Sequence, residues 1–253
     1  MCLIALAWQA DSRHRLLVAA NRDEWRERPT GAAAWWPDHP EILAGRDLRA
    51  GGTWMGVTRS GRFAAVTNFR DPSDKRSTAL SRGTLVADFL LATESAADFL
   101  ARLAERAALF NGFNLVVGDG TSLMYLGSRE PVPRAIAPGV HGLSNHLLDE
   151  PWPKVVRARS SMLAALADPD PAPRLFDLLS DTRGADDSEL PDTGVGLAWE
   201  RRLAPALITG TDYGSRASTV VSMDGDGAVA FEERSRAEDG AVGAIARFAF
   251  RVS

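Results

Sequence analysis

The order of alternating and helical segments constrains the fold of this chain more than any other feature. Short apolar stretches bounded by turn residues occupy both ends of the sequence. Two Ala- and Leu-rich segments with helical spacing, Thr84–Ala92 and Ala96–Ala108, lie between them, and a third helix is predicted over Pro153–Ala167. Strands, then helices, then strands, without regular strand–helix–strand alternation, favour an α+β layered fold. We expect one domain spanning residues 1–253.

The predicted strands are short, apolar and joined by turn residues. They are Leu3–Trp8, Leu16–Ala20, Thr53–Thr58, Arg62–Thr67, Leu115–Gly118, Ser122–Leu126, Ala217–Met223, Ala228–Arg234 and Ala244–Val252. Asp224-Gly225-Asp226-Gly227 is a typical hairpin turn. A polar segment of about residues 180–196 is longer than most connections, which predicts a functional or mobile loop.

Composition excludes several classes of function. The chain has 253 residues, 45% of them apolar and 25% charged, as in ordinary globular proteins. A net charge of −4 without a basic stripe predicts no nucleic-acid partner. No apolar stretch approaches the roughly 18–20 residues of a membrane span. The apolar run Leu3–Trp8 follows no basic residue, so it predicts a strand rather than a signal peptide, and we expect a cytoplasmic protein.

Cysteine and histidine usage predicts neither a metal nor a cofactor. A single cysteine, Cys2, excludes an internal disulfide framework and multi-cysteine metal clusters. The four histidines are too dispersed for a zinc set, and no phosphate-binding or dinucleotide-binding glycine motif is present. The sequence therefore does not predict a nucleotide-binding protein.

Cys2 is the strongest candidate for a catalytic residue in this sequence. Removal of Met1 would leave a thiol and a free α-amine on the same residue. An α-amine with a pKa of about 7.7–8.0 can accept the thiol proton near neutral pH, which is one form of nucleophile activation. The alternative is that Cys2 packs as a small apolar residue, as free cysteines commonly do.

The first hairpin is expected to bring charged residues to Cys2. If Trp8 pairs with Leu16, paired residue numbers sum to 24, and Cys2 lies opposite Arg22 with Asn21 and Asp23 beside it. A guanidinium near a thiol favours the thiolate. A carboxylate near the α-amine can hold the ammonium formed when it takes up the proton. A solvated strand end is the alternative for this charged run.

Ordered motifs resemble one known family. The opening Cys2 with Ala19-Ala20-Asn21-Arg22-Asp23-Glu24 resembles the NRDE family, also called the transport-and-Golgi-organisation family. Further matching segments are Ala44-Gly45-Arg46-Asp47, Gly51-Gly52-Thr53-Trp54, Thr67-Asn68-Phe69-Arg70, Asn111-Gly112-Phe113-Asn114, Leu143-Ser144-Asn145-His146, Pro151-Trp152-Pro153-Lys154, Leu190-Pro191-Asp192-Thr193-Gly194-Val195 and Tyr213-Gly214-Ser215-Arg216. The resemblance covers nearly the whole chain.

That family is similar to N-terminal-nucleophile hydrolases of the choloylglycine hydrolase and penicillin V acylase group. The resemblance implies a four-layer αββα sandwich with antiparallel sheets. It also implies a site with Cys2 as nucleophile, Asp23 as its carboxylate and Asn68 as oxyanion donor. Asn145 would orient the terminal amine and the substrate, and Arg216 would be a C-terminal active-site arginine.

One position departs from the pattern of those hydrolases. They carry an arginine where this chain has Ala20, and the sequence leaves open whether Arg22, which shares its strand face, replaces it. Trp54 could floor an apolar ligand groove, and His146 could line the pocket; core packing and a surface loop are the alternatives.

Two functions are expected from these residues, and both use one cleft. The first is a hydrolase or acyltransferase that acts on a small linear amide or acyl thioester through a Cys2 acyl-enzyme, with Asn21 and Arg22 binding substrate. The second is a non-catalytic carrier of haem, acyl-CoA or lipid, with Cys2 and His146 as the possible iron ligands. The acyl group, the acceptor and the oligomeric state are left open.

Overall fold

The computed structural model describes residues 2–74 and 76–253. Its longer helices are α1 (Gly83–Leu91), α2 (Ala96–Ala104), α3 (Pro153–Ala165), α4 (Ala172–Leu178) and α5 (Leu197–Leu203). Its strands are β1 (Cys2–Trp8), β2 (His14–Trp25), β3 (Thr30–Trp35), β4 (Ile42–Asp47), β5 (Met55–Thr58), β6 (Phe63–Asn68), β7 (Phe113–Gly118), β8 (Leu123–Gly127), β9 (Glu130–Ala135), β10 (Gly139–Leu143), β11 (Tyr213–Asp224), β12 (Ala228–Arg236) and β13 (Val242–Arg251).

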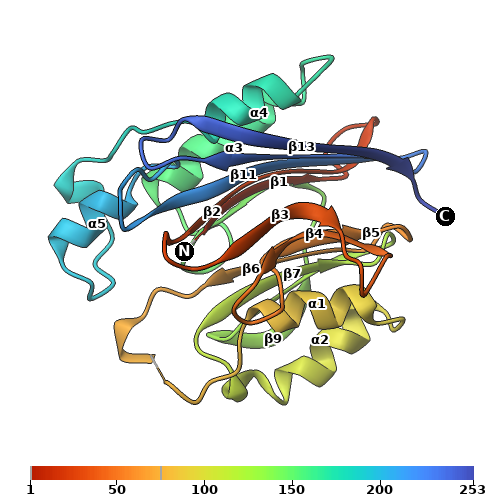
Figure 1. Ribbon diagram of the computed structural model, residues 1–253, viewed down its shortest axis with the longest axis horizontal. Coiled ribbons are helices and arrows are strands. Elements are labelled where there is room, and N and C mark those ends of the chain that lie inside the picture. Colours follow the sequence, from red (N-terminus) through yellow and green to blue (C-terminus); the bar gives the residue numbers. More distant parts are fainter. Residues whose placement is uncertain (1, 75) are drawn as a thin grey trace.

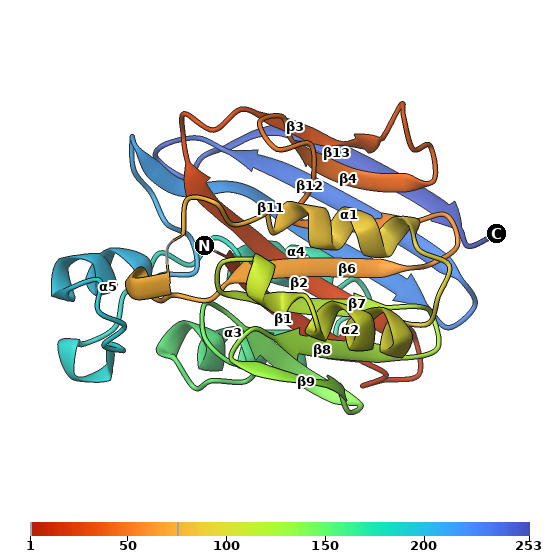
Figure 2. The ribbon, with the colours of Figure 1, turned by 90° about the horizontal axis from the view of Figure 1, so that it is seen from below.

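The strands form two antiparallel sheets that pack face to face. One sheet has six strands in the order β10-β1-β2-β11-β12-β13, and the other has seven in the order β3-β4-β5-β6-β7-β8-β9. Helices α3 and α4 cover the outer face of the six-stranded sheet (Figure 1), and α1 and α2 lie across the outer face of the seven-stranded sheet (Figure 2). The α+β class and the four-layer αββα arrangement with antiparallel sheets are therefore confirmed.

Alternation of side chains along β1 explains the layering. Ile4 and Leu6 pack between the sheets against residues such as Phe63 of β6, whereas Leu3 and Ala5 pack against α3 and α4. A strand that is buried on both faces must be apolar at odd and even positions alike, which is why Leu3–Trp8 is a continuous apolar run.

The predicted register of the first hairpin is confirmed. Trp8 pairs with Leu16 and Cys2 pairs with Arg22. On its other side β1 pairs with β10, where Ile4 lies opposite Leu143. Because β1 has a strand on each side, the position of Cys2 at the start of the strand is fixed from both sides.

Several elements differ from the sequence prediction. The strands β3, β4, β9 and β10 and the helices α4 and α5 were not expected from the pattern. The second helix ends at Ala104, and Ala107–Leu109 continues as a separate 3-10 turn. Helix α3 ends at Ala165 rather than at Ala167, before Asp168–Pro173, and α4 begins within that segment at Ala172.

Candidate functional site

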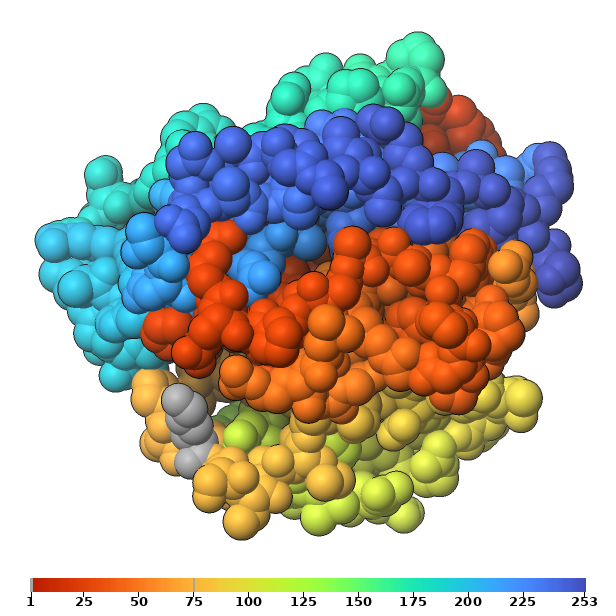
Figure 3. Space-filling model, viewed as in Figure 1, coloured from red at the N-terminus to blue at the C-terminus, as the bar shows by residue number. Residues whose placement is uncertain are grey.

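A cavity of about 350 Å³ opens where the two sheets meet at the N-terminal end of β1. Its wall combines the end of the β1–β2 hairpin, the residues around Trp54 in the second sheet, and the segment 76–83 that leads into α1. In the space-filling view the surface is recessed between the red-orange N-terminal segments and the yellow-orange segment before α1 (Figure 3). Four predicted site residues in the first hairpin and β6 line this cavity: Cys2, Arg22, Asp23 and Asn68.

Cys2 reaches the cavity because of its parity in β1. It shares the inter-sheet face of the strand with Ile4, and it lies opposite Arg22 at the point where the apolar core gives way to polar residues. Its backbone carbonyl accepts a hydrogen bond of 3.2 Å from Ser144 Oγ. The thiol therefore sits at the base of an open, polar space.

Burial raises the pKa of the Cys2 thiol, and the Asp23 carboxylate adds to this effect while the Arg22 guanidinium opposes it. In the chain that retains Met1, burial therefore opposes the thiolate that a nearby guanidinium favours. Met1, on whose removal the proposed α-amine depends, lies outside the described residues. The pairing of Cys2 with Arg22 alone does not make the thiol acidic.

Asp23 is held by the strand on the other side of β2. Ser215 in β11 is its register partner, and Ser215 Oγ donates a hydrogen bond of 2.6 Å to Asp23 Oδ1. A β-bulge between Ser215 and Ala217 interrupts the ladder at this point. Burial raises the pKa of Asp23, and the cation of Lys154 and the Ser215 hydroxyl act in the opposite direction.

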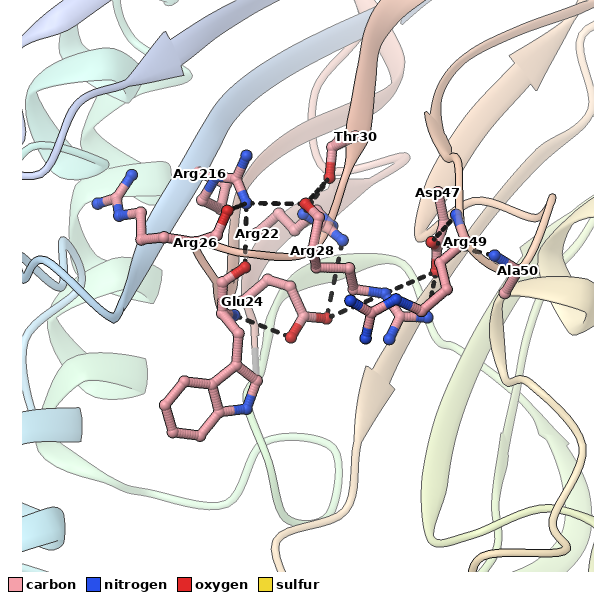
Figure 4. A network of polar contacts seen from close by, with 10 residues as sticks. Arg22, Glu24, Arg26, Arg28, Thr30, Asp47, Arg49, Ala50 and Arg216 are labelled. Atoms are coloured by element: carbon pink, nitrogen blue, oxygen red, sulfur yellow. Dashed lines mark hydrogen bonds and ion pairs between the residues drawn. The ribbon is translucent and has the colours of Figure 1, made fainter.

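The Arg22 side chain lies flat in the cavity wall. Its guanidinium stacks 4.5 Å from the centre of the Trp54 ring, and Nη1 donates to Thr30 Oγ1 over 3.2 Å. Nη2 lies 3.7 Å from Glu24 Oε2 (Figure 4). Trp54 thus lines the cavity as predicted, and it does so as a platform for a cation rather than as the floor of an apolar groove.

The side chain of Asn145 holds the backbone of Asn68. It is fully buried in the loop after β10, and its Nδ2 donates a hydrogen bond of 3.0 Å to the backbone carbonyl of Asn68. Its own carbonyl accepts from the Arg70 N–H over 2.7 Å. Asn145 is absent from the described lining of the cavity, so its side chain fixes the strand end that carries Asn68.

Three further predicted residues also lie outside the described lining of the cavity: Asn21, His146 and Arg216. Asn21 faces the helical layer, where Nδ2 donates to the carbonyls of Leu179 and Ala206. Its odd position in β2 places it on the opposite face from Arg22. Asp23 has the same parity as Asn21, but it lies two residues nearer the end of β2, where it lines the cavity.

Arg216 and His146 have structural partners of their own. Arg216 Nη1 donates to the backbone carbonyls of Trp25, Arg26 and Arg28 at 3.0 to 3.1 Å and so holds the turn between β2 and β3 (Figure 4). The His146 ring packs 4.8 Å from that of Phe69, and its Nδ1 lies 3.1 Å from Glu150 Oε2. His146 does not share the described cavity lining with Cys2, where a haem iron would need both ligands.

Sequence reasoning missed three arginines that line the cavity: Arg28, Arg76 and Arg82. Arg28 is paired with Asp47, with Nη2 2.6 Å from Oδ2. These residues lie in connections between elements, where no periodic pattern indicates direction. The available signal was the pair Gly51-Gly52 before Thr53, because adjacent glycines permit the close backbone approach that places segment 76–83 here.

A buried charged cluster lies on the helical side of β1 and β2. Arg70 Nη1 and Glu200 Oε2 form an ion pair of 2.5 Å, and both side chains are almost fully buried. Glu200 Oε1 also accepts from the N–H and hydroxyl of Thr193. This pair anchors α5 and the polar segment of about residues 180–196, most of which forms no helix or strand.

Lys154, at the start of α3, belongs to the same cluster. Burial lowers its pKa to about 8, and the cation of Arg70 acts in the same direction while Asp23 opposes it. Its Nζ donates to the carbonyl of Leu203 over 2.9 Å. The segment Pro151–Lys154 thereby supplies a cation that interacts with Asp23.

Within residues 2–74 and 76–253, no three His, Cys, Asp or Glu side chains are grouped so as to hold a metal ion. Across the same residues, no helix is long and apolar enough to cross a membrane.

The fold and the cavity define an antiparallel αββα sandwich with one cysteine at the start of its first strand. The family model of Transport and Golgi organisation 2 matches residues 1–238. The chain belongs to the Transport and Golgi organisation 2 family, which confirms the family expected from the motifs.

Relatives in animals align along almost the whole length of both chains. The Transport and Golgi organization protein 2 homolog of Bos taurus is 36% identical over 93% of each chain, and that of Homo sapiens is 34% identical over the same share. The Drosophila melanogaster protein is 27% identical over 93% of this chain and 92% of its own. Among solved structures, the C2A mutant of the conjugated bile acid hydrolase from Clostridium perfringens has a TM-score of 0.48 at 9% identity, covering 100% of this chain and 98% of its own.

Proposed function

We propose that the chain, after removal of Met1, is an N-terminal-cysteine hydrolase or acyltransferase that acts on a small linear amide or acyl thioester. The observation that carries the proposal is the convergence of Cys2, Arg22, Asp23 and Asn68 on one cavity of about 350 Å³. A volume in the range of about 300–1,000 Å³ suits a small organic ligand. The family resemblance assigns the same residues, apart from Arg22, to catalysis.

The reaction would proceed in two steps. The α-amine of Cys2 takes the thiol proton, and the sulfur attacks the substrate carbonyl to form a tetrahedral oxyanion. Collapse of this intermediate breaks the bond to the amine or thiol leaving group, which takes up the proton, and leaves a thioester on Cys2. Water or an acceptor amine then attacks the thioester and restores the thiol.

Each residue at the cavity has a role in this scheme. The Asn68 side chain would donate to the oxyanion, and loss of one such donor costs about 2.7–4 kcal/mol in barrier height. Asp23 would orient the ammonium formed on Cys2, and Arg22 would stabilise the thiolate before attack. Asn145 would act indirectly, because its side chain holds the backbone carbonyl of Asn68.

Acylation of Cys2 tests the proposal directly. Intact mass measurement should first show a native chain that begins at Cys2; a retained Met1 would remove the base. Incubation with a panel of amides and acyl thioesters should then add one acyl mass to the wild type and none to Cys2→Ala. Arg174→Gln, an exposed substitution in α4, serves as the control that should acylate normally. Absence of an adduct from every compound would refute the enzyme.

One observation favours a carrier instead. Burial raises the pKa of the Cys2 thiol, and a protonated thiol is a weak nucleophile. A carrier of haem, acyl-CoA or lipid in the same cavity would need no thiolate. Added haem should then give a saturable Soret shift that persists in His146→Ala, because His146 lies outside the described lining of the cavity. No shift at micromolar protein, together with acylation of Cys2, would exclude the haem carrier.

A further inference from the structure

Arg82 enters the cavity wall through a contact between two glycines. A Cβ added to Gly52 would lie 2.4 Å from the backbone carbonyl carbon and oxygen of Gly83. With a larger residue at position 52, the segment around Gly52 and the start of α1 could therefore not approach each other as closely. The N–H of Thr53 donates to the Gly83 carbonyl over 3.1 Å. The backbone around Arg82 is thereby fixed against the segment that carries Trp54.

Three of the four arginines that line the described cavity have a carboxylate partner. Arg28 has Asp47 as its partner, Arg22 has Glu24, and Arg76 lies 3.7 Å from Asp74. Among the described residues, Arg82 takes part in no ion pair. The structure gives its side chain one hydrogen bond, from Nη1 to the carbonyl of Gly112 at 3.0 Å.

Arg82 is nevertheless partly withdrawn from solvent. Burial lowers its pKa, while the nearby charges of Glu24 and the Cys2 sulfur favour the guanidinium. A guanidinium is charged at any pH at which proteins function, so its desolvation must be offset by an anion or by hydrogen bonds to oxygen. One backbone carbonyl satisfies only one of its five N–H groups.

We propose that Arg82 binds an anionic group of the substrate, a carboxylate or a phosphate, while the substrate carbonyl lies at Cys2. Both residues line the same cavity, and the planar fork of N–H groups on a guanidinium matches two oxygens of either anion. The inference rests on the proposed function and narrows its substrate class to acyl compounds that carry a negative charge. The paired arginines Arg22 and Arg28 have carboxylate partners already and are secondary to this site.

Binding measured without turnover separates this inference from the proposed chemistry. Isothermal titration calorimetry on the full chain and on Cys2→Ala would use inorganic phosphate, glutarate and the neutral analogue glutaramide. We expect at least one of the two anions to bind both proteins, and glutaramide to bind neither. A preference for phosphate or for glutarate shows whether the anionic group of the substrate is a phosphate or a carboxylate.

Substitution of Arg82 tests the residue itself. Arg82→Gln should weaken anion binding about tenfold or more, Arg82→Lys should weaken it less because the charge stays, and the exposed Arg174→Gln should leave it unchanged. Arg82→Lys also keeps the test valid if the glutamine variant fails to fold. Equal anion affinity in Arg82→Lys and wild type with no loss in Arg82→Gln, or equal binding of glutaramide and glutarate, would overturn the inference.

The two proposals fail in different ways. Arg82-dependent anion binding without acylation of Cys2 would uphold the anion site and refute the enzyme. Acylation of Cys2 by neutral and anionic acyl compounds at equal rates, with no effect of Arg82→Gln, would uphold the enzyme and refute the anion site.

Discussion

The side-chain amide of Asn145 donates a hydrogen bond of 3.0 Å to the backbone carbonyl of Asn68. Asn145 is fully buried in the loop after β10, and Asn68 is the last residue of β6, at the cavity. Ser144 Oγ, beside it, binds the carbonyl of Cys2. The loop after β10 thus contacts the backbone of both residues proposed to face the reacting carbonyl.

Asn145→Ala should reduce both stability and acylation. A buried carbonyl that loses its donor costs about 1–3 kcal/mol, so the free energy of unfolding in urea should fall by that amount. Acyl transfer to Cys2 should slow because the strand end at Asn68 loses its support. Ser160→Ala, on an exposed turn of α3, should change neither quantity. Normal acylation in a destabilised Asn145→Ala would show that Asn145 has no part in positioning Asn68.

Alkylation of Cys2 against pH reports the state of the thiol, and Cys2 is the single cysteine of the chain. Since burial raises its pKa, protein that retains Met1 should react with iodoacetamide with a midpoint above the ordinary value of about 8.5. Protein that begins at Cys2 should react at lower pH, because its α-amine can share the proton. A midpoint at or below the ordinary value with Met1 retained would contradict the first statement.

Substitutions at the same cavity should separate ground-state from transition-state effects. Arg22→Ala removes a cation that opposes the rise, so the alkylation profile should move to still higher pH. Asn68→Ala should leave the profile unchanged and slow acyl transfer alone, because an oxyanion donor acts in the transition state. Equal profiles in wild type and Arg22→Ala would remove Arg22 from thiol activation.

The pH dependence of stability should carry the signature of Lys154. Its pKa is about 8 in the folded chain and near the ordinary value of about 10.4 in the unfolded chain. Between these values the unfolded chain binds the additional proton, so this group makes stability rise with pH by at most about 1.4 kcal/mol per unit. Lys154→Met should lack that rise between about pH 8 and 10. Parallel unfolding curves of wild type and variant across this window would contradict the burial of a titrating lysine.

Loss of Glu200 should release the polar segment that it anchors. Glu200→Ala leaves Arg70 without its buried ion-pair partner, which costs about 3–5 kcal/mol when one member of such a pair is removed. Residues 180–196 should then be cleaved by trypsin or a similar protease under conditions where the wild type is resistant. Asp187→Ala, which breaks an exposed ion pair with Arg201, is the matched control and should cost less than about 1 kcal/mol.

The sequence predicted the parts of the fold that depend on local pattern. The register of β1 against β2 followed from two apolar runs and one short loop, and it is confirmed down to Cys2 and Arg22. The strand β3 was missed because Thr30–Trp35 is rich in alanine, and β10 was missed because two of its five residues are glycine. Both are strands only through partners elsewhere in the chain.

The candidate site was predictable to a similar degree. Cys2, Arg22 and Asp23 came from the hairpin, and Asn68 came from the family resemblance; all four reach the cavity. Arg82 was not predicted, because its place depends on a contact between Gly52 and Gly83, which are 31 residues apart in the chain.

The position of Cys2 at the start of β1 has a practical consequence for handling the protein. Cys2 lines the cavity, whereas the C-terminus lies at the opposite end of the molecule (Figure 1). An affinity tag fused before Cys2 would therefore occupy the opening and block the α-amine, and material purified that way would give a false negative in every ligand screen. Tags belong after Ser253, where the exposed chain end leaves the opening clear.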